Sequence, residues 1–141
     1  MDKETINKSR TENAFGNKVL YDMCINNPLH NNNDVISGKV WLIGRAYAVA
    51  IERVREKKYI NDDFYSEIVP KIFNEFYKDF DNDIKDIKEN DLNNALSVHK
   101  KLTDAIKNVT GLEKRSFNSK YLHFHCPDIF YIYDSRANVL F

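Results

Sequence analysis

The sequence predicts a single all-α domain of five or six helices that takes in the whole chain, residues 1–141. Three observations support this fold class. Apolar residues recur every three to four positions in several segments, which is the spacing of one helix face. Glycine and proline are scarce, with four and three among 141 residues, so few turns are signalled. The length suits one domain with its own hydrophobic core.

The N-terminal part of the chain predicts one helix between two polar segments. Residues 1–10 are polar and are expected to be disordered. Thr11–Cys24 follows as a helix, and its apolar residues share one face: Ala14, Phe15, Val19, Leu20 and Met23. Ile25–Asp34 contains five asparagines and a proline, a composition typical of a loop.

The second helix is expected over Lys39–Glu56, with Ser37 as its N-cap. It is apolar over much of its surface, which predicts a central position in the domain. Gly44 lies inside it and would allow a neighbouring backbone or a ligand to approach closely.

The third helix is expected from Asp63 to about Phe80. Pro70 interrupts its apolar pattern, so the chain either kinks there or starts a new helix at that residue. Asp91 is the expected cap of a fourth helix, which Gly111 ends in the usual left-handed conformation.

The C-terminal segment predicts a fifth helix from Ser116 to about Cys126, ended by Pro127. A short extended run, Phe130–Tyr133, follows it. Asp134 is then the expected cap of a last helix, and this helix has barely two turns before the chain ends. The apolar end at residues 139–141 predicts either burial in the core or a shortened relative of a longer protein.

Charge and cysteine content restrict the classes of partner. The formal net charge is zero, which argues against a strong non-specific polyanion binder. Lys39–Lys58 and Lys100–Lys120 each carry six basic and two acidic residues, and these segments either converge on one face or are solvated helix surfaces. The chain has no membrane-spanning run and no signal sequence, and its two cysteines suit a reduced, cytoplasmic setting.

Lys120 and Asp134 are the residues most suggestive of chemistry. A helix that ends at Pro127, followed by a tight return, would bring the Asp134 carboxylate back toward the helix that carries Lys120. An amine in an apolar pocket is nucleophilic and can form a Schiff base, and a nearby carboxylate can orient it. The alternative is a surface lysine and an N-capping aspartate with no catalytic role.

The run TGLEKRSFNSKYLHFHCPDIFYIYDSRA, residues 110–137, resembles the catalytic segment of helix-hairpin-helix DNA glycosylases, in particular small bacterial proteins related to 8-oxoguanine DNA glycosylase. The resemblance implies an all-α glycosylase-like fold with a shortened C-terminus. It places Gly111 in the hairpin, Lys120 at the position of the lysine that attacks the sugar carbon, and Asp134 at the position of the aspartate that supports this attack. DNA is the implied partner.

Other residues are candidates for contacts with DNA or another substrate. Arg45 and Arg136 can each present a guanidinium to a phosphate or carboxylate, and Trp41 and Tyr47 can stack on a base. The alternative for Trp41, Arg45 and Tyr47 is an ion-paired arginine beside aromatic residues of the core. Three further candidates lie near the expected hairpin or on the face of Lys120: Arg115, Ser116 and His123.

We expect neither a metal nor a cofactor. His123 and His125 are two residues apart, so a helix directs them to different sides, and Cys126 and Cys24 do not complete a metal-binding pattern. The sequence also lacks the motifs of nucleotide-binding loops and zinc proteases.

Two functional hypotheses follow from these patterns. The first is a DNA glycosylase-like protein in repair or defence, with lyase activity through Lys120. The second is a non-catalytic helical module that binds a nucleotide, nucleic acid or protein partner in a mobile-element or phage–host conflict system. In that second case Trp41, Arg45 and Arg136 matter more than Lys120. A homodimer formed through the apolar C-terminal end is an open alternative.

Overall fold

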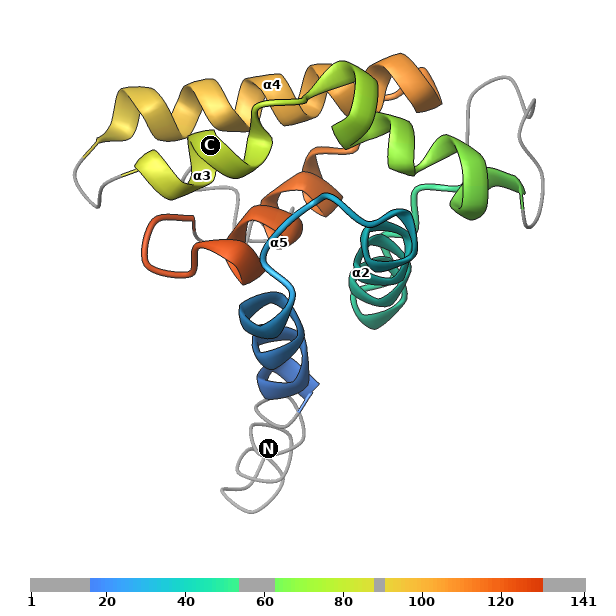
Figure 1. Cartoon of the computed structure of the whole chain (residues 1–141), viewed down its shortest axis with the longest axis horizontal. Coiled ribbons are helices and arrows are strands. Elements are labelled where there is room, and N and C mark those ends of the chain that lie inside the picture. Colours follow the sequence, from blue (N-terminus) through green and yellow to red (C-terminus); the bar gives the residue numbers. More distant parts are fainter. Residues whose placement is uncertain (1–15, 54–62, 88–90, 131–141) are drawn as a thin grey trace, which may run out of the picture.

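The computed structural model describes residues 16–53, 63–87 and 91–130, which form helices joined by short connections (Figure 1). These ranges contain no β-strand, so the all-α prediction is confirmed for them. The predictions for residues 1–10, for the extended run beyond Phe130 and for the helix after Asp134 lie outside the described residues. In chain order the elements are an N-terminal helix (16–26), α2 (Asn33–Ala46), η1 (Phe64–Ile68), η2 (Ile72–Phe76), α3 (Phe80–Asp86), α4 (Leu92–Thr110) and α5 (Arg115–His125).

Helix α5 occupies the middle of the arrangement. It packs against α4 on one side and α2 on the other, and Figure 1 shows it between the layer of α4 and the part of the chain that contains the N-terminal helix and α2. Helix α4 also packs against η2 and α3, and α2 against η1. Among the described helices, none combines the length and the apolar character needed to cross a bilayer.

The core is formed where these elements meet around α5. Helices α2, α3, α4 and α5, with η1 and η2, contribute large side chains that are almost fully removed from water, and this burial is the main favourable contribution to folding. They include Ile36 and Ile43 of α2, Phe64, Ile72, Phe80, Leu102 and Ile106, and Phe117, Tyr121 and Phe124 of α5. Cys24 is buried and Cys126 half-buried, both as unpaired thiols.

Helix α2 begins earlier than the sequence predicted. Its N-cap is Asn32, whose side-chain oxygen accepts hydrogen bonds from the backbone N–H groups of Asp34 and Val35 at 2.9 and 3.2 Å. Ser37, the expected cap, lies inside the helix and donates to the carbonyl oxygen of Tyr65. The boundary was wrong because the cap lies within the asparagine-rich segment expected to be a loop.

Helix α2 also ends earlier, at Ala46 instead of Glu56. The chain turns at Ala48, which has a left-handed φ of 54°, and folds back on the helix. A Cβ atom on Gly44 would lie 3.1 Å from the Cα of Ala50. The prediction that Gly44 permits a close backbone approach is therefore confirmed.

The expected helix Asp63–Phe80 is divided on either side of Pro70. Both halves, η1 and η2, are π-helical, and the N–H of Val69 donates to the carbonyl of Phe64, five residues earlier, at 2.9 Å. Tyr77 interrupts the helix before α3 begins at Phe80. The expected single helix is therefore replaced by η1 and η2, and α3 begins only at its last residue.

The ends of α4 agree with the sequence, and α5 starts one residue earlier than predicted. The Asp91 carboxylate accepts a hydrogen bond from the N–H of Asn94 at 3.1 Å, and Gly111 ends α4 with a φ of 76°. Helix α5 begins at Arg115 after Lys114 and has no side-chain cap. Ser116, the predicted first residue, lies in its first turn.

Candidate functional site

A hairpin of residues 111–114 joins α4 to α5 and turns twice through the left-handed conformation. Gly111 has a φ of 76°, and Lys114 has a φ of 51° directly before α5. The Asn118 side chain donates hydrogen bonds to the Thr103 hydroxyl at 2.9 Å and to the Glu113 carbonyl at 3.0 Å. These bonds fix the start of α5 against α4, and so they fix the direction in which α5 leaves the hairpin.

Lys120 lies in the second turn of α5 and is only 6% exposed. Its Nζ donates a hydrogen bond to the Ser116 hydroxyl, one turn earlier, at 2.9 Å. The same nitrogen lies 5.4 Å from the centroid of the Tyr47 ring, a distance typical of a cation–π contact. Three of the residues singled out in the sequence therefore meet: Lys120, Ser116 and Tyr47.

Tyr47 reaches Lys120 because it directly follows the last residue of α2, and α2 packs against α5. Its ring is 5.8 Å from that of Phe124, and its hydroxyl donates to the side-chain oxygen of Asn17, on the N-terminal helix, at 2.6 Å. Burial raises the pKa of the Tyr47 phenol. Tyr47 thus places an aromatic ring with a protonated hydroxyl beside the Lys120 amine.

His123 lies one turn beyond Lys120 on α5, and both of its ring nitrogens have partners. Nδ1 is 2.6 Å from the carbonyl oxygen of Phe130, and Nε2 contacts the Tyr21 hydroxyl of the N-terminal helix. A carbonyl oxygen only accepts, so Nδ1 carries a hydrogen, and in the neutral imidazole Nε2 accepts from Tyr21. His123 therefore connects α5 to two other parts of the chain.

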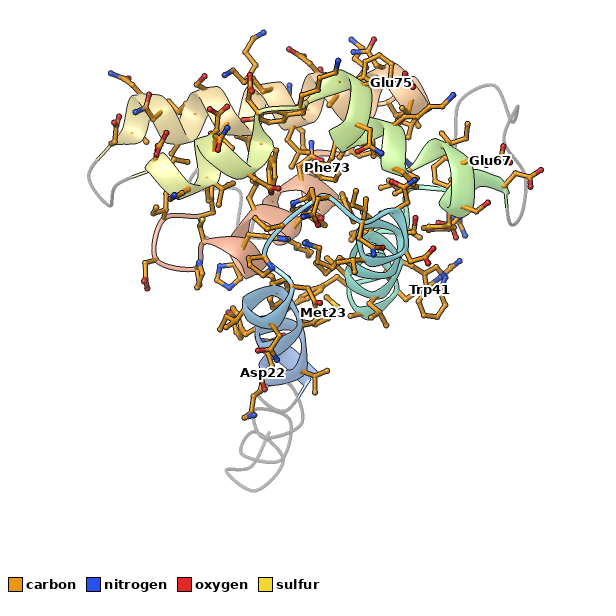
Figure 2. All side chains as sticks on the ribbon, viewed as in Figure 1. Asp22, Met23, Trp41, Glu67, Phe73 and Glu75 are labelled. Carbon is orange, nitrogen blue, oxygen red and sulfur yellow. The ribbon has the colours of Figure 1, made fainter. Side chains whose placement is uncertain are left out.

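Trp41 and Arg45 do not join this group. Trp41 lies on the side of α2 that faces away from α5 (Figure 2) and is 45% exposed. Arg45 forms an ion pair with Glu52, and its guanidinium carbon is 5.8 Å from the centroid of the Trp41 ring. The alternative interpretation, an ion-paired arginine beside core aromatic residues, is therefore correct for Arg45 but not for Trp41, which lies at the surface.

The remaining candidates lie near the hairpin or outside the described chain. Arg115, at the start of α5, forms an exposed ion pair with Glu113 at 2.8 Å. Gly111 lies in the same hairpin. Asp134 and Arg136 are outside the residues that the structure describes.

A second buried lysine, Lys39, was missed by the sequence analysis. It is 1% exposed, and its Nζ donates to the carbonyl oxygens of Asn27 and Leu29 at 2.8 and 3.4 Å and contacts His125 Nε2 at 3.1 Å. Burial lowers the pKa of Lys39 to about 8. A charged residue between the apolar positions Ile36 and Ile43 of a central helix was the available signal.

His30 extends this buried polar group toward α3. Its Nδ1 is 2.7 Å from the Asp81 carboxylate, and its Nε2 is 2.5 Å from the Tyr121 hydroxyl. Burial lowers the pKa of His30 to about 4, although Asp81 opposes the shift, and burial also places the pKa of His125 well below its ordinary value. No local pattern pairs His30 with Asp81, because the two are 51 residues apart.

Two surface depressions among the described residues are not lined by Lys120. One of about 420 Å³ lies between α4 and the hairpin and is lined by His99, Thr103 and Arg115, among others. Another of about 450 Å³ lies at the end of α2, where Gly44 and Arg45 line it. Within the described chain, no three histidine, cysteine or acidic side chains converge in a way that would hold a metal ion.

Comparison of the chain with protein-family models, curated proteins and solved structures gives no match. Its function is therefore inferred from the residues and their geometry.

Proposed function

We propose that the protein is a DNA glycosylase-like enzyme that acts on a damaged or modified base and forms a Schiff base through Lys120. The observation that carries the proposal is the position of this side chain. Lys120 is 6% exposed and contacts the Ser116 hydroxyl and the Tyr47 ring. A surface lysine extends its amine into water, whereas Lys120 lies inside the domain, on the helix that follows the hairpin.

In the proposed reaction, the unprotonated Lys120 amine attacks C1′ of a deoxyribose that has lost its base. A C–N bond forms, the nitrogen gives up a proton and the aldehyde oxygen gains one. This oxygen then takes a second proton and leaves as water, and a protonated imine remains. The face of the Tyr47 ring attracts the imine cation.

Asp134 is the proposed electrostatic partner of Lys120. The bond from His123 to the Phe130 carbonyl places Phe130 beside the turn of α5 that follows Lys120. Asp134 is four residues further along the chain, and four residues span at most about 14 Å when fully extended. The spacing is therefore compatible with a carboxylate close to the amine, where it would stabilise the imine cation.

Borohydride trapping tests this proposal on duplexes that contain an abasic site or 8-oxoguanine. We expect a covalent protein–DNA adduct with the wild type and none with Lys120→Ala. Lys101→Ala is the matched control, because it removes an exposed amine of α4 that is paired with Asp83 at 3.1 Å and should leave the adduct unchanged. An adduct that persists in a folded Lys120→Ala variant would contradict the role of Lys120.

A non-catalytic binding module is the second candidate, and the exposed pair Trp41 and Arg45 favours it. An indole covered by a guanidinium at the surface offers a stacking platform to a base or an aromatic side chain. In this case Trp41→Ala and Arg45→Ala should weaken binding of single-stranded DNA, while Lys120→Ala should not. Fluorescence of Trp41, which is the only tryptophan of the sequence, reports the binding directly.

A further inference from the structure

Two residues of the N-terminal helix that lie one turn apart, Asn17 and Tyr21, contact neighbours of Lys120 on α2 and α5. The Asn17 side-chain oxygen accepts a hydrogen bond from the Tyr47 hydroxyl at 2.6 Å. The Tyr21 hydroxyl contacts Nε2 of His123, and the Tyr21 ring packs on that of Phe124 with centroids 4.8 Å apart. One face of this helix therefore holds an aromatic side chain of α2 and a histidine of α5.

Both ring nitrogens of His123 already have partners within the domain. Its Nδ1–H is used by the Phe130 carbonyl at 2.6 Å, and its Nε2 by the Tyr21 hydroxyl. The Tyr21 and His123 rings also meet edge to face, with centroids 5.4 Å apart. Binding a substrate atom would break one of these bonds, so the histidine is suited to holding its neighbours in place.

The hydrogen bond from His123 to the Phe130 carbonyl connects α5 to the chain that follows it. After Cys126 the chain makes a turn in which the N–H groups of Ile129 and Phe130 both donate to the Cys126 carbonyl, at 3.1 and 3.0 Å. These bonds shape the turn. The bond from His123 attaches the end of the turn to α5, one helical turn from Lys120, and Phe130 is buried there.

We propose that Tyr21 and His123 are a positioning pair for Lys120. Tyr21 fixes the orientation of the His123 ring, and His123 holds the chain that leaves α5 beside the turn that carries the amine. This inference rests on the proposed function, since it assigns the pair to the Schiff-base site. Neither residue contacts the reacting atoms, so their effect is on the geometry of attack and not on DNA binding.

Single-turnover borohydride trapping on the abasic-site duplex tests the pair. Tyr21→Phe removes one hydroxyl and keeps the ring. We expect the trapping rate constant to fall by about 10- to 100-fold, which is the usual effect of misplacing a reacting group. The protein concentration that half-saturates the DNA should not change, and the melting temperature should stay within about 2 °C of the wild type.

Two further variants distinguish positioning from a general loss of structure. Tyr65→Phe is the matched control, because the Tyr65 hydroxyl donates to Glu52 at 2.6 Å, away from Lys120; its trapping rate should equal that of the wild type. His123→Asn keeps an N–H donor for the Phe130 carbonyl and should retain more of the rate than His123→Ala. Equal rates for the wild type, Tyr21→Phe and His123→Ala would overturn the inference.

A measurement without DNA keeps this inference separate from the proposed function. Formaldehyde with borohydride methylates lysines, and peptide mapping reports Lys120 and Lys39 individually. Because His123 holds the segment after α5 beside the turn that follows Lys120, Tyr21→Phe should increase methylation of Lys120 at least about threefold and leave Lys39 unchanged. If the wild type forms no adduct with DNA, the Schiff-base proposal fails and this measurement decides: unchanged Lys120 methylation would refute the positioning pair as well.

Discussion

Lys39 Nζ and His125 Nε2 lie 3.1 Å apart inside the domain. The lysine amine donates to the imidazole, whose Nδ1–H in turn donates to the Tyr121 carbonyl at 2.8 Å. The same amine donates to the carbonyl oxygens of Asn27 and Leu29, just after the N-terminal helix. One buried side chain therefore connects α2, α5 and the loop between the N-terminal helix and α2.

We expect Lys39→Met to lower the free energy of unfolding by about 2–4 kcal/mol, because two carbonyl oxygens and one imidazole nitrogen lose their donor in a buried place. Urea denaturation measures the loss. The control is Lys101→Met, which removes an exposed lysine paired with Asp83 at 3.1 Å and should change stability by about 0.5 kcal/mol or less. Similar losses in the two variants would contradict a structural role for the Lys39 bonds.

Stability should fall as the pH drops below 6.5. Burial lowers the folded-state pKa of His30 to about 4 and that of His125 well below 6.5, so the unfolded chain binds more protons than the folded one in this range. The loss is about 1.4 kcal/mol per pH unit for each histidine, and stability above pH 6.5 is unaffected by them. Protonation of His125 would add a positive charge beside Lys39. Protonation of His30 would add one between the Asp81 carboxylate and the neutral Tyr121 hydroxyl.

The variant His125→Gln checks this assignment. Its unfolding free energy, measured from pH 7.5 to 4.5, should depend on pH less steeply than that of the wild type by about one proton, whatever its absolute stability. A slope identical to that of the wild type would mean that other groups cause the acid sensitivity.

Alanine at the two glycines of α2 should have opposite effects. A Cβ atom added to Gly38 would meet no atom within 4 Å, whereas a Cβ on Gly44 would lie 3.1 Å from the Ala50 backbone. Gly38→Ala should therefore stabilise the protein by about 0.5–1 kcal/mol through helix propensity. Gly44→Ala should destabilise it by about 1 kcal/mol because backbone must move. Thermal unfolding of both variants gives the comparison, and a stabilising Gly44→Ala would show that residues 48–50 yield easily.

The hairpin offers a second pair of opposite substitutions. Gly111 and Lys114 both have a left-handed φ, of 76° and 51°. Gly111→Ala should lower the free energy of unfolding by about 1 kcal/mol, and Lys114→Gly should raise it by up to about 1 kcal/mol. The reason is that only glycine adopts this conformation without strain. The exposed bond from Lys114 Nζ to the Arg53 carbonyl at 2.9 Å is lost in the second variant and reduces the gain. A destabilised Lys114→Gly would show that this bond outweighs the strain.

Local signals were enough to predict α4. Its cap Asp91 and its last turn at Gly111 are set by residues next to each other in the sequence, and its apolar spacing is regular. The bounds of α2 were not accessible in this way. Its first residue depends on which of several asparagines acts as the cap, and its end depends on the approach of Ala50 to Gly44, which is a tertiary contact.

The candidate site was predictable only in part for the same reason. Lys120 was identified from the sequence, but its burial and its contact with Tyr47 arise from the packing of α2 on α5. The helical spacing already separates Trp41 from the buried face that contains Lys39, so its outward position could have been deduced. Tyr21 could not, because its partner His123 is 102 residues away.

The π-helical geometry of η1 and η2 affects how the chain tolerates changes of length. Each such turn holds one residue more than an α-helical turn, as the bond from the Val69 N–H to the Phe64 carbonyl illustrates. Deleting one residue within η1 can restore an ordinary α-helical turn and leave the helix continuous. A deletion within α4 cannot be absorbed in this way, because every following residue would rotate by about 100° about the helix axis. The buried residues of α4 would then turn away from α5. Single-residue deletions are therefore better accommodated within η1 or η2 than within α4.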